Sequence, residues 1–293
     1  MSSSDVTTRL GSILRRVRGD ALVREQGRAH RRALEEMRRS VDRLEAEVGG
    51  DLALRLDSLE RSIAQLDATL RSAAGAPESS ATATGPVITA DLGSWRSVAQ
   101  EGELSFHKRP NIRSGDEWVS SNDRMWRGFG FEPSGWDGKV VVDIGAGSRL
   151  RSLFFEGSRI IAVEPLADQY VAEVEWHDLD RAEALHSVPA ETEIPELEGT
   201  ADLVVSINAL DHGYEFDEAV RNIASYVKPD GLVFLSYDEH SVVDELHPLV
   251  ISDDISREIF DRHGLAVEDF RRTAGYHPGL GGGALNYWLR PAA

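Results

Sequence analysis

The chain has 293 residues, enough for one large domain plus an accessory segment, and an apolar fraction of 41% that can build a core. The absence of cysteine excludes disulfides, thiolate metal sites and cysteine nucleophiles, and agrees with a reducing compartment. The net charge of −18 argues against a nucleic acid partner, because an acidic surface repels phosphates. With no signal-peptide core and no apolar run long enough to span a bilayer, the sequence predicts a soluble cytoplasmic protein.

Residues 1–71 have the pattern of a helical, coiled-coil segment. Two short apolar seams, separated by a pair of glycines, repeat with alternating spacings of three and four residues. They are formed by Leu34, Met37, Val41, Leu44 and Val48, then by Leu56, Leu59, Ile63, Leu66 and Leu70. A seam this short cannot bury its apolar stripe alone, so it either pairs with a second copy of the chain or lies on the following domain. We prefer the first, which makes a homo-oligomer.

The rest of the chain divides into a linker and a second domain. Residues 72–88 are rich in small, polar and helix-breaking residues, which is typical of a flexible linker. The second domain is expected over 89–293. Its first part, 89–138, contains a helix beginning near Ser94 and a polar, aromatic stretch, and we expect it to cap the sheet that follows.

From Lys139 onward, strand-like runs alternate with helical ones, which predicts an α/β fold with a doubly wound parallel sheet. The expected strands are 140–144, 159–163, 201–207, 231–236, 265–270 and 284–289. A helix with one apolar face is expected over 216–227. The segment 171–178 is the best candidate for a further strand between the second and third of these.

A glycine-rich turn at the end of the first strand predicts a nucleotide-like ligand. In a doubly wound sheet, ligands bind beyond the carboxyl ends of the strands. Gly145 and Gly147 let a ligand approach the backbone, and Glu164, after the next strand, can accept hydrogen bonds from ribose hydroxyls. Asp143, two residues before Gly145, would repel a pyrophosphate but suits a ligand with an amino group. Leu150 stands where a dinucleotide motif has its third glycine.

These motifs resemble the class I S-adenosylmethionine-dependent methyltransferase family over residues 139–289. Four segments match in order: 142–147, 161–165, 202–212 and 227–233. The resemblance implies a seven-stranded Rossmann-like sheet with an antiparallel last strand, and S-adenosylmethionine as cofactor. It implies that the cofactor is held by Asp143, Gly145, Ala146, Gly147, Glu164, Pro165, Asn208 and Ala209. Asp178 is a candidate for the adenine, and Arg149 departs from the family's usual third glycine.

The candidate catalytic residues are Asp211 and His212, which follow the fourth strand of the family's sheet. Methyl transfer from a sulfonium needs mainly alignment of nucleophile, methyl group and sulfur, and a hydroxyl nucleophile also needs a base. Imidazole exchanges protons near neutral pH, so His212 is the preferred base, although it could also serve only to orient the loop.

Candidate acceptor residues are His107, Arg113, Tyr214 and Asp238, a mixture of aromatic and charged groups suited to a sugar or an acidic small molecule. No metal is required by this interpretation. The group that could bind a divalent cation consists of Asp238, Glu239, His240, Asp244 and His247, with the three carboxylates as the weak candidates. The alternative is an acidic loop that binds no ion.

The leading hypothesis is an enzyme that methylates a hydroxyl of a glycan or small molecule in a bacterial polysaccharide or secondary-metabolite pathway. One alternative is a non-catalytic ligand-binding or scaffold protein with a methyltransferase-like fold. Another is an NAD-dependent oxidoreductase.

Overall fold

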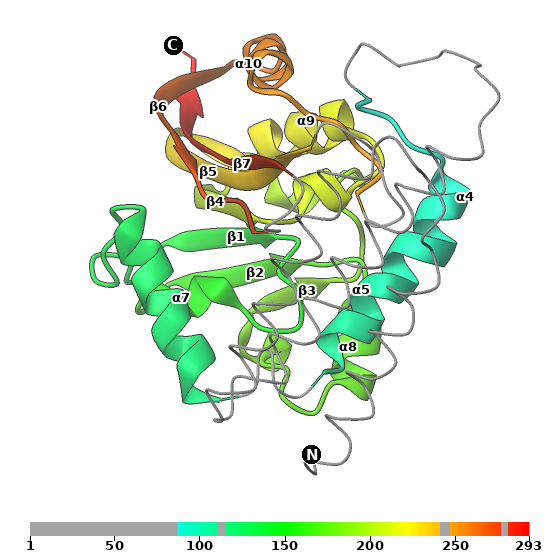
Figure 1. Cartoon of the computed structure of the whole chain (residues 1–293). Helices are drawn as coiled ribbons and strands as arrows, with labels where there is room; N and C mark the ends of the chain where they lie inside the picture. The colour runs from blue at the N-terminus through cyan, green and yellow to red at the C-terminus, as the bar shows by residue number, and fades with distance from the viewer. Residues whose placement is uncertain (1–86, 110–114, 241–246, 277–280, 293) are drawn as a thin grey trace, which may run out of the picture. The chain divides into compact units, whose positions relative to one another are not determined.

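The computed structural model describes residues 87–109, 115–240, 247–276 and 281–292 (Figure 1). The chain divides into two units, Met1–Ala81 and Thr82–Ala293, and every described residue belongs to the second. The expected coiled coil and nearly all of the expected linker therefore lie outside the described residues. Within the described part of the chain, no helix is long and apolar enough to cross a membrane.

The unit is a seven-stranded sheet flanked by helices. The strands are β1 (Val140–Ile144), β2 (Arg159–Val163), β3 (Ala184–His186), β4 (Ala201–Ile207), β5 (Val227–His240), β6 (Leu265–Thr273) and β7 (Gly281–Pro291). The α-helices are α4 (Leu92–Ser94), α5 (Gln100–His107), α7 (Asp116–Gly128), α8 (Ala167–Glu173), α9 (Phe216–Tyr226) and α10 (Asp253–Arg262). Short helical segments are η1 (Trp95–Ala99), η2 (Arg151–Phe154), η3 (Leu179–Arg181), η4 (Pro195–Leu197) and η5 (Leu210–His212).

The strand order is β3-β2-β1-β4-β5-β7-β6, with β1 to β5 parallel and β7 antiparallel to both of its neighbours. This confirms the doubly wound sheet and its antiparallel last strand. The order reverses between β1 and β4, which is where such sheets open a crevice for a ligand.

The two faces of the sheet are buried under different helices, as the alternation of side chains along a strand requires. In β1, Val140, Val142 and Ile144 pack with α9 and α10 in the larger core cluster. The intervening Val141 packs on the other face with Trp126 of α7. Asp143 points to that same second face, so its carboxylate lies under the layer that α7 covers.

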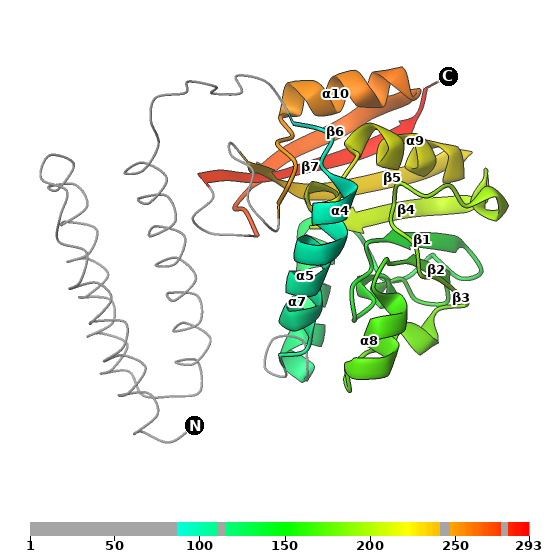
Figure 2. The ribbon, with the colours of Figure 1, turned by 90° about the vertical axis from the view of Figure 1, so that its right-hand side faces the viewer.

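The helices α4, η1 and α5 follow one another without a break and form one continuous helical rod. The residue that caps the C-terminal end of each of the first two is the first residue of the next. Figure 2 shows this rod standing across the end of the sheet toward which β4 points. The rod confirms the helix expected near Ser94 and extends it to His107. It thus brings a segment that precedes the sheet in sequence to the edge where a ligand would bind.

The expected strand at 171–178 is wrong. Ala167–Glu173 is helix α8, in which Tyr170 is buried and Val171 is exposed, and the strand β3 comes later, at Ala184–His186. The three residues of β3 are only half-buried and lie at the sheet edge, so they lack the continuous apolar run that marks a central strand.

Candidate functional site

The turn after β1 packs directly against the loop after β4. Gly145 and Gly147 both have a φ of 67°, in the left-handed region that glycine adopts without strain. A Cβ on Gly145 would overlap the side chain of Ala209, far inside van der Waals contact. The glycine is therefore required for two reasons, backbone conformation and the close approach of two strand ends.

Glu164 joins the tip of β2 to the same turn. One carboxylate oxygen accepts a hydrogen bond from the Gly147 amide at 2.8 Å, and the other accepts from the Leu166 amide at 2.9 Å. The side chain is buried, so these bonds hold it in one orientation. The glycine turn and the acid, identified separately in the sequence, form one hydrogen-bonded unit.

Asp143 lies beneath that turn, with 3% of its surface exposed. Its carboxylate accepts a hydrogen bond from the Ser152 amide at 3.3 Å. Burial raises the pKa of the Asp143 carboxyl, opposed by the Ser152 hydrogen bonds and by the positive charge of Arg151. A buried carboxylate of this kind is stabilised by a cationic group, which is what an amino group of a ligand provides.

Asn208, at the end of β4, is held in a strained conformation. Among the described residues it is the one non-glycine residue with a left-handed φ, 53°, and its amide donates to the Ser236 carbonyl at 2.7 Å. Its side-chain oxygen is buried and has no hydrogen-bond partner within the described part of the chain. Strain together with an unsatisfied buried acceptor is typical of a position shaped by a ligand.

Asp178 is hydrogen-bonded to the segment that follows the glycine turn. Its two carboxylate oxygens accept hydrogen bonds from the Leu150 amide at 2.6 Å and from Arg149 at 2.7 Å. The Arg149 guanidinium in turn lies 4.6 Å from the ring of Trp118. The departure at Arg149 thus has a structural basis, because the arginine links Asp178 to the aromatic side chain of α7.

His107, expected near the acceptor, contacts Ser148, directly after the glycine turn. Its Nδ1 lies 2.7 Å from Ser148 Oγ and its ring stacks on Tyr170 at 4.5 Å. On the preceding turn of α5, Glu103 lies 3.7 Å from His107 Nε2. Sequence reasoning missed Glu103, although a Glu–His pair four residues apart on a helix was a readable signal.

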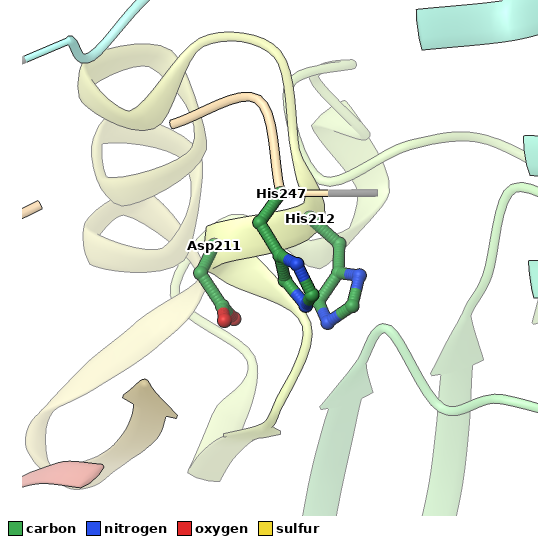
Figure 3. A group of neighbouring side chains, drawn as sticks. All are labelled: Asp211, His212 and His247. Carbon is green, nitrogen blue, oxygen red and sulfur yellow. The ribbon is translucent and has the colours of Figure 1, made fainter. Parts of the chain in front are cut away.

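Asp211 and His212 meet His247 at the end of β4, as Figure 3 shows. One potential ligand atom from each of the three lies within 4.8 Å of the others. The His212 and His247 ring centres are 4.4 Å apart, and Asp211 is fully buried. His212 Nδ1 is also 3.2 Å from a carboxylate oxygen of Glu103, while Trp95 donates a hydrogen bond to the His212 carbonyl.

Tyr214 lies beside this group, but its ring packs on Trp95 at 4.9 Å, and its amide donates to Glu191. Burial raises the pKa of the Tyr214 hydroxyl. Arg113 lies outside the described residues.

At the end of β5, Asp238 belongs to a polar network that includes Tyr276. Asp238 accepts a hydrogen bond from the Tyr276 amide at 2.8 Å, and the Tyr276 hydroxyl lies 2.5 Å from Ser236 Oγ. Burial raises the pKa of Tyr276 to about 12, so this hydroxyl stays protonated at neutral pH.

The three carboxylates considered for a cation are not brought together. Asp238 is buried, whereas Glu239, on the opposite face of the strand, forms an ion pair with Arg272. Asp244 lies outside the described residues.

Known structures share this fold. The [4+2]-cyclase SpnF is 14% identical, with 71% of this chain and 100% of that chain covered and a TM-score of 0.52. A SAM-dependent methyltransferase from Leishmania major is 16% identical, covering 73% and 100%, with a TM-score of 0.48. A 1,6-didemethyltoxoflavin-N1-methyltransferase from Burkholderia thailandensis, with bound S-adenosylhomocysteine, is 17% identical, covering 73% and 99%, with a TM-score of 0.46. A search of curated protein sequences finds no significant match.

A protein-family profile described as a methyltransferase domain matches residues 123–271, just over half of the chain. The match includes the turn after β1, the acid after β2 and the loop after β4. The residues around the turn also fit a ligand with a ribose and an amino group: a buried carboxylate, an unsatisfied Asn208 oxygen and a glycine that admits no side chain. The chain therefore belongs to the S-adenosylmethionine-dependent methyltransferase family, and its cofactor is S-adenosylmethionine.

Proposed function

We propose that the enzyme methylates a hydroxyl group of a small-molecule or glycan acceptor, bound beside the loop after β4. One observation carries this proposal. The same loop packs Ala209 on the glycine turn and, directly after it, presents Asp211 and His212. A methyl donor held at the turn and an acceptor held at the pair would then lie within reach of each other.

The proposed cofactor site combines residues at the carboxyl ends of β1, β2 and β4. Asp143 would neutralise the amino group of the methionine portion, beneath the backbone of Gly145, Ala146 and Gly147. Glu164 and Pro165 would face the ribose, since each oxygen of a carboxylate can accept more than one hydrogen bond. Asn208 and Ala209 would lie on the sulfonium side, and Asp178, next to the turn, is the candidate nearest the adenine.

When bound, S-adenosylmethionine supplies a methyl group on a positively charged sulfur. The protein has to align the acceptor oxygen with that methyl group and help the oxygen lose its proton. The Asp211–His212 pair is suited to this second task, because Asp211 is fully buried and His212 is held by Glu103 and Trp95. We therefore propose these two residues as the groups that activate the acceptor.

The acceptor class is proposed from side chains around this pair. His107, Tyr214 and Asp238, with Arg113, would provide aromatic and charged contacts to a polar acceptor such as a sugar. A bacterial polysaccharide or secondary-metabolite pathway in the cytoplasm suits that chemistry. We also propose that residues 1–71 associate the enzyme into a homo-oligomer.

Titration calorimetry with S-adenosylhomocysteine tests the cofactor site. The wild-type chain should bind, and Asp143→Asn and Glu164→Gln should lose most of that affinity. Glu175→Gln, at an exposed acid, is the matched control and should bind like the wild type. A wild-type chain that binds NAD but not S-adenosylhomocysteine would contradict the proposal.

Turnover tests the acceptor-activating pair. A mass-shift screen of glycans and small metabolites, run with a deuterated methyl donor, identifies an acceptor first. With that acceptor, His212→Ala should lower turnover about 10²- to 10⁴-fold, the usual contribution of a group that moves a proton, while S-adenosylhomocysteine still binds. Unchanged turnover would remove His212 from this role.

A further inference from the structure

The side chains of Asp211 and His212, from η5, and of His247, from the segment before α10, lie close together (Figure 3). We propose that these three residues bind a divalent transition-metal ion, which would activate the acceptor hydroxyl. This inference rests on the proposed function, because it assigns to the ion the proton loss that was assigned above to the Asp211–His212 pair. In this arrangement His212 acts through the metal rather than as a free base.

The donor set decides which ions fit. Two imidazoles and one carboxylate are the protein ligands of many catalytic zinc sites and of non-haem iron(II) sites, in which a further position stays open for water or substrate. Mg²⁺ and Ca²⁺ prefer oxygen ligands, so two imidazoles disfavour them. The chain has no cysteine that could offer a competing thiolate site.

The geometry is close to what such an ion needs. Metal–nitrogen and metal–oxygen bonds of about 2 Å place ligand atoms roughly 3 to 4 Å apart. The three ligand atoms lie within 4.8 Å of one another, so binding would draw them together by about an ångström. Asp211 and His247 are buried, with 0% and 4% of their surfaces exposed, which excludes most competing water.

Glu103 supplies an independent observation. Histidines that bind metals usually donate their second ring N–H to a carboxylate, which fixes the tautomer and the ring orientation. Glu103 Oε1 lies 3.2 Å from His212 Nδ1, so an N–H on Nδ1 can be directed at this carboxylate and Nε2 can bind the ion. The hydrogen bond from Trp95 to the His212 carbonyl holds the backbone of the same residue. We assign Glu103 as a positioning residue for His212.

The chemical step then balances as follows. The acceptor hydroxyl binds the ion through oxygen and releases its proton to solvent, because a bound cation lowers the pKa of an oxygen ligand. A lone pair of that oxygen forms the new carbon–oxygen bond as the carbon–sulfur bond breaks, and the bonding electrons pass to sulfur. The ion changes neither charge nor oxidation state.

Metal binding by the full-length chain, free of any affinity tag, tests the inference without cofactor or acceptor. After dialysis against a chelator, Co²⁺ alone is followed by visible absorption and Zn²⁺ alone by calorimetry. We expect one ion per chain at this site, and loss of that binding in His212→Ala and in His247→Gln. His186→Gln, on β3, is the matched control and should bind like the wild type. Glu103→Gln should weaken binding about 10- to 100-fold, as expected for a positioning residue.

Two results would overturn the inference: no binding of either ion to the wild-type chain, or binding that His212→Ala and His247→Gln leave unchanged. Retained binding of S-adenosylhomocysteine shows that each variant is folded. The same measurement keeps the two proposals distinguishable, because a chain that binds S-adenosylhomocysteine but neither ion retains the methyl-transfer proposal and loses the metal.

Discussion

Gly145 shows how much of the proposed cofactor site depends on the absence of one side chain. Gly145→Ala would place a Cβ in a left-handed conformation and against Ala209. We expect it to lower the free energy of unfolding by about 2 to 4 kcal/mol, the sum of backbone strain and overpacking, and to weaken S-adenosylhomocysteine binding. Chemical denaturation and calorimetry measure the two effects.

Gly138→Ala is the matched control, because Gly138 has a φ of 70° but no atom within 4 Å of an added Cβ. It should cost only the strain, about 1 to 2 kcal/mol. Ala209→Gly in the Gly145→Ala background should recover the steric part of the loss. If Gly145→Ala and Gly138→Ala lower the free energy of unfolding equally, the contact with Ala209 does not contribute to the loss.

Glu191 is a half-buried acid whose carboxyl has a raised pKa. Burial raises the pKa of its carboxyl, even though it accepts hydrogen bonds from the Tyr214 and Glu215 amides. An acid whose pKa is raised on folding lowers the free energy of unfolding at high pH, where it is charged in both states. This loss of stability disappears as the pH falls toward the pKa of the carboxyl in the unfolded chain. Glutamine keeps the acceptor oxygen without the charge.

We therefore expect Glu191→Gln to raise the Tm at about pH 8 and to lose that advantage toward about pH 5. Thermal unfolding followed by circular dichroism at both pH values checks this. A lower Tm for the variant at about pH 8 would mean that the charged hydrogen bonds outweigh the cost of burial.

At the scale of elements, α7 is attached to the sheet mainly through Trp126. This side chain is fully buried among Phe131, Phe155 and Phe234, and its indole N–H donates to the Arg151 carbonyl at 2.9 Å. The single tryptophan thus connects α7, β5 and the segment that follows the glycine turn after β1.

Trp126→Ala should lower the free energy of unfolding by about 3 to 5 kcal/mol through the cavity that it leaves. Trp136→Ala, at a half-buried tryptophan that contacts Phe155, is the control and should cost clearly less. Denaturant titration compares the two variants. If both variants lowered the free energy of unfolding equally, burial of Trp126 would make no special contribution to the packing of α7.

For the whole molecule, an element could be predicted from the sequence where its own residues carry the pattern, and not where its position depends on distant contacts. The central strands were correct because a strand buried on both faces carries a continuous apolar run. The strand β3 was misplaced because three half-buried edge residues carry no such run. The rod of α4, η1 and α5 was expected as a helix, but its position across the sheet end follows from contacts with Ser148 and His212, which no periodicity encodes.

The division into two units also leads to a prediction for the whole chain. A chain that begins at Thr82 keeps every described contact of the sheet and its site. We expect it to bind S-adenosylhomocysteine like the full chain but to form a smaller species in light scattering, since the proposed seam lies in residues 1–71. An unchanged oligomeric state would exclude that seam as the contact between copies.

The sequence by itself determined the family and the cofactor, and it predicted the residues of the glycine turn as part of the cofactor site. Glycine spacing, a preceding aspartate and an acid after the next strand are properties of short segments, and the backbone conformation that they impose is local. Only the tertiary structure decided which side chains meet Asp211 and His212, the pair proposed to activate the acceptor. Glu103 and His247 approach His212 from segments far apart in the chain, and such contacts depend on how helices and loops pack around a finished sheet.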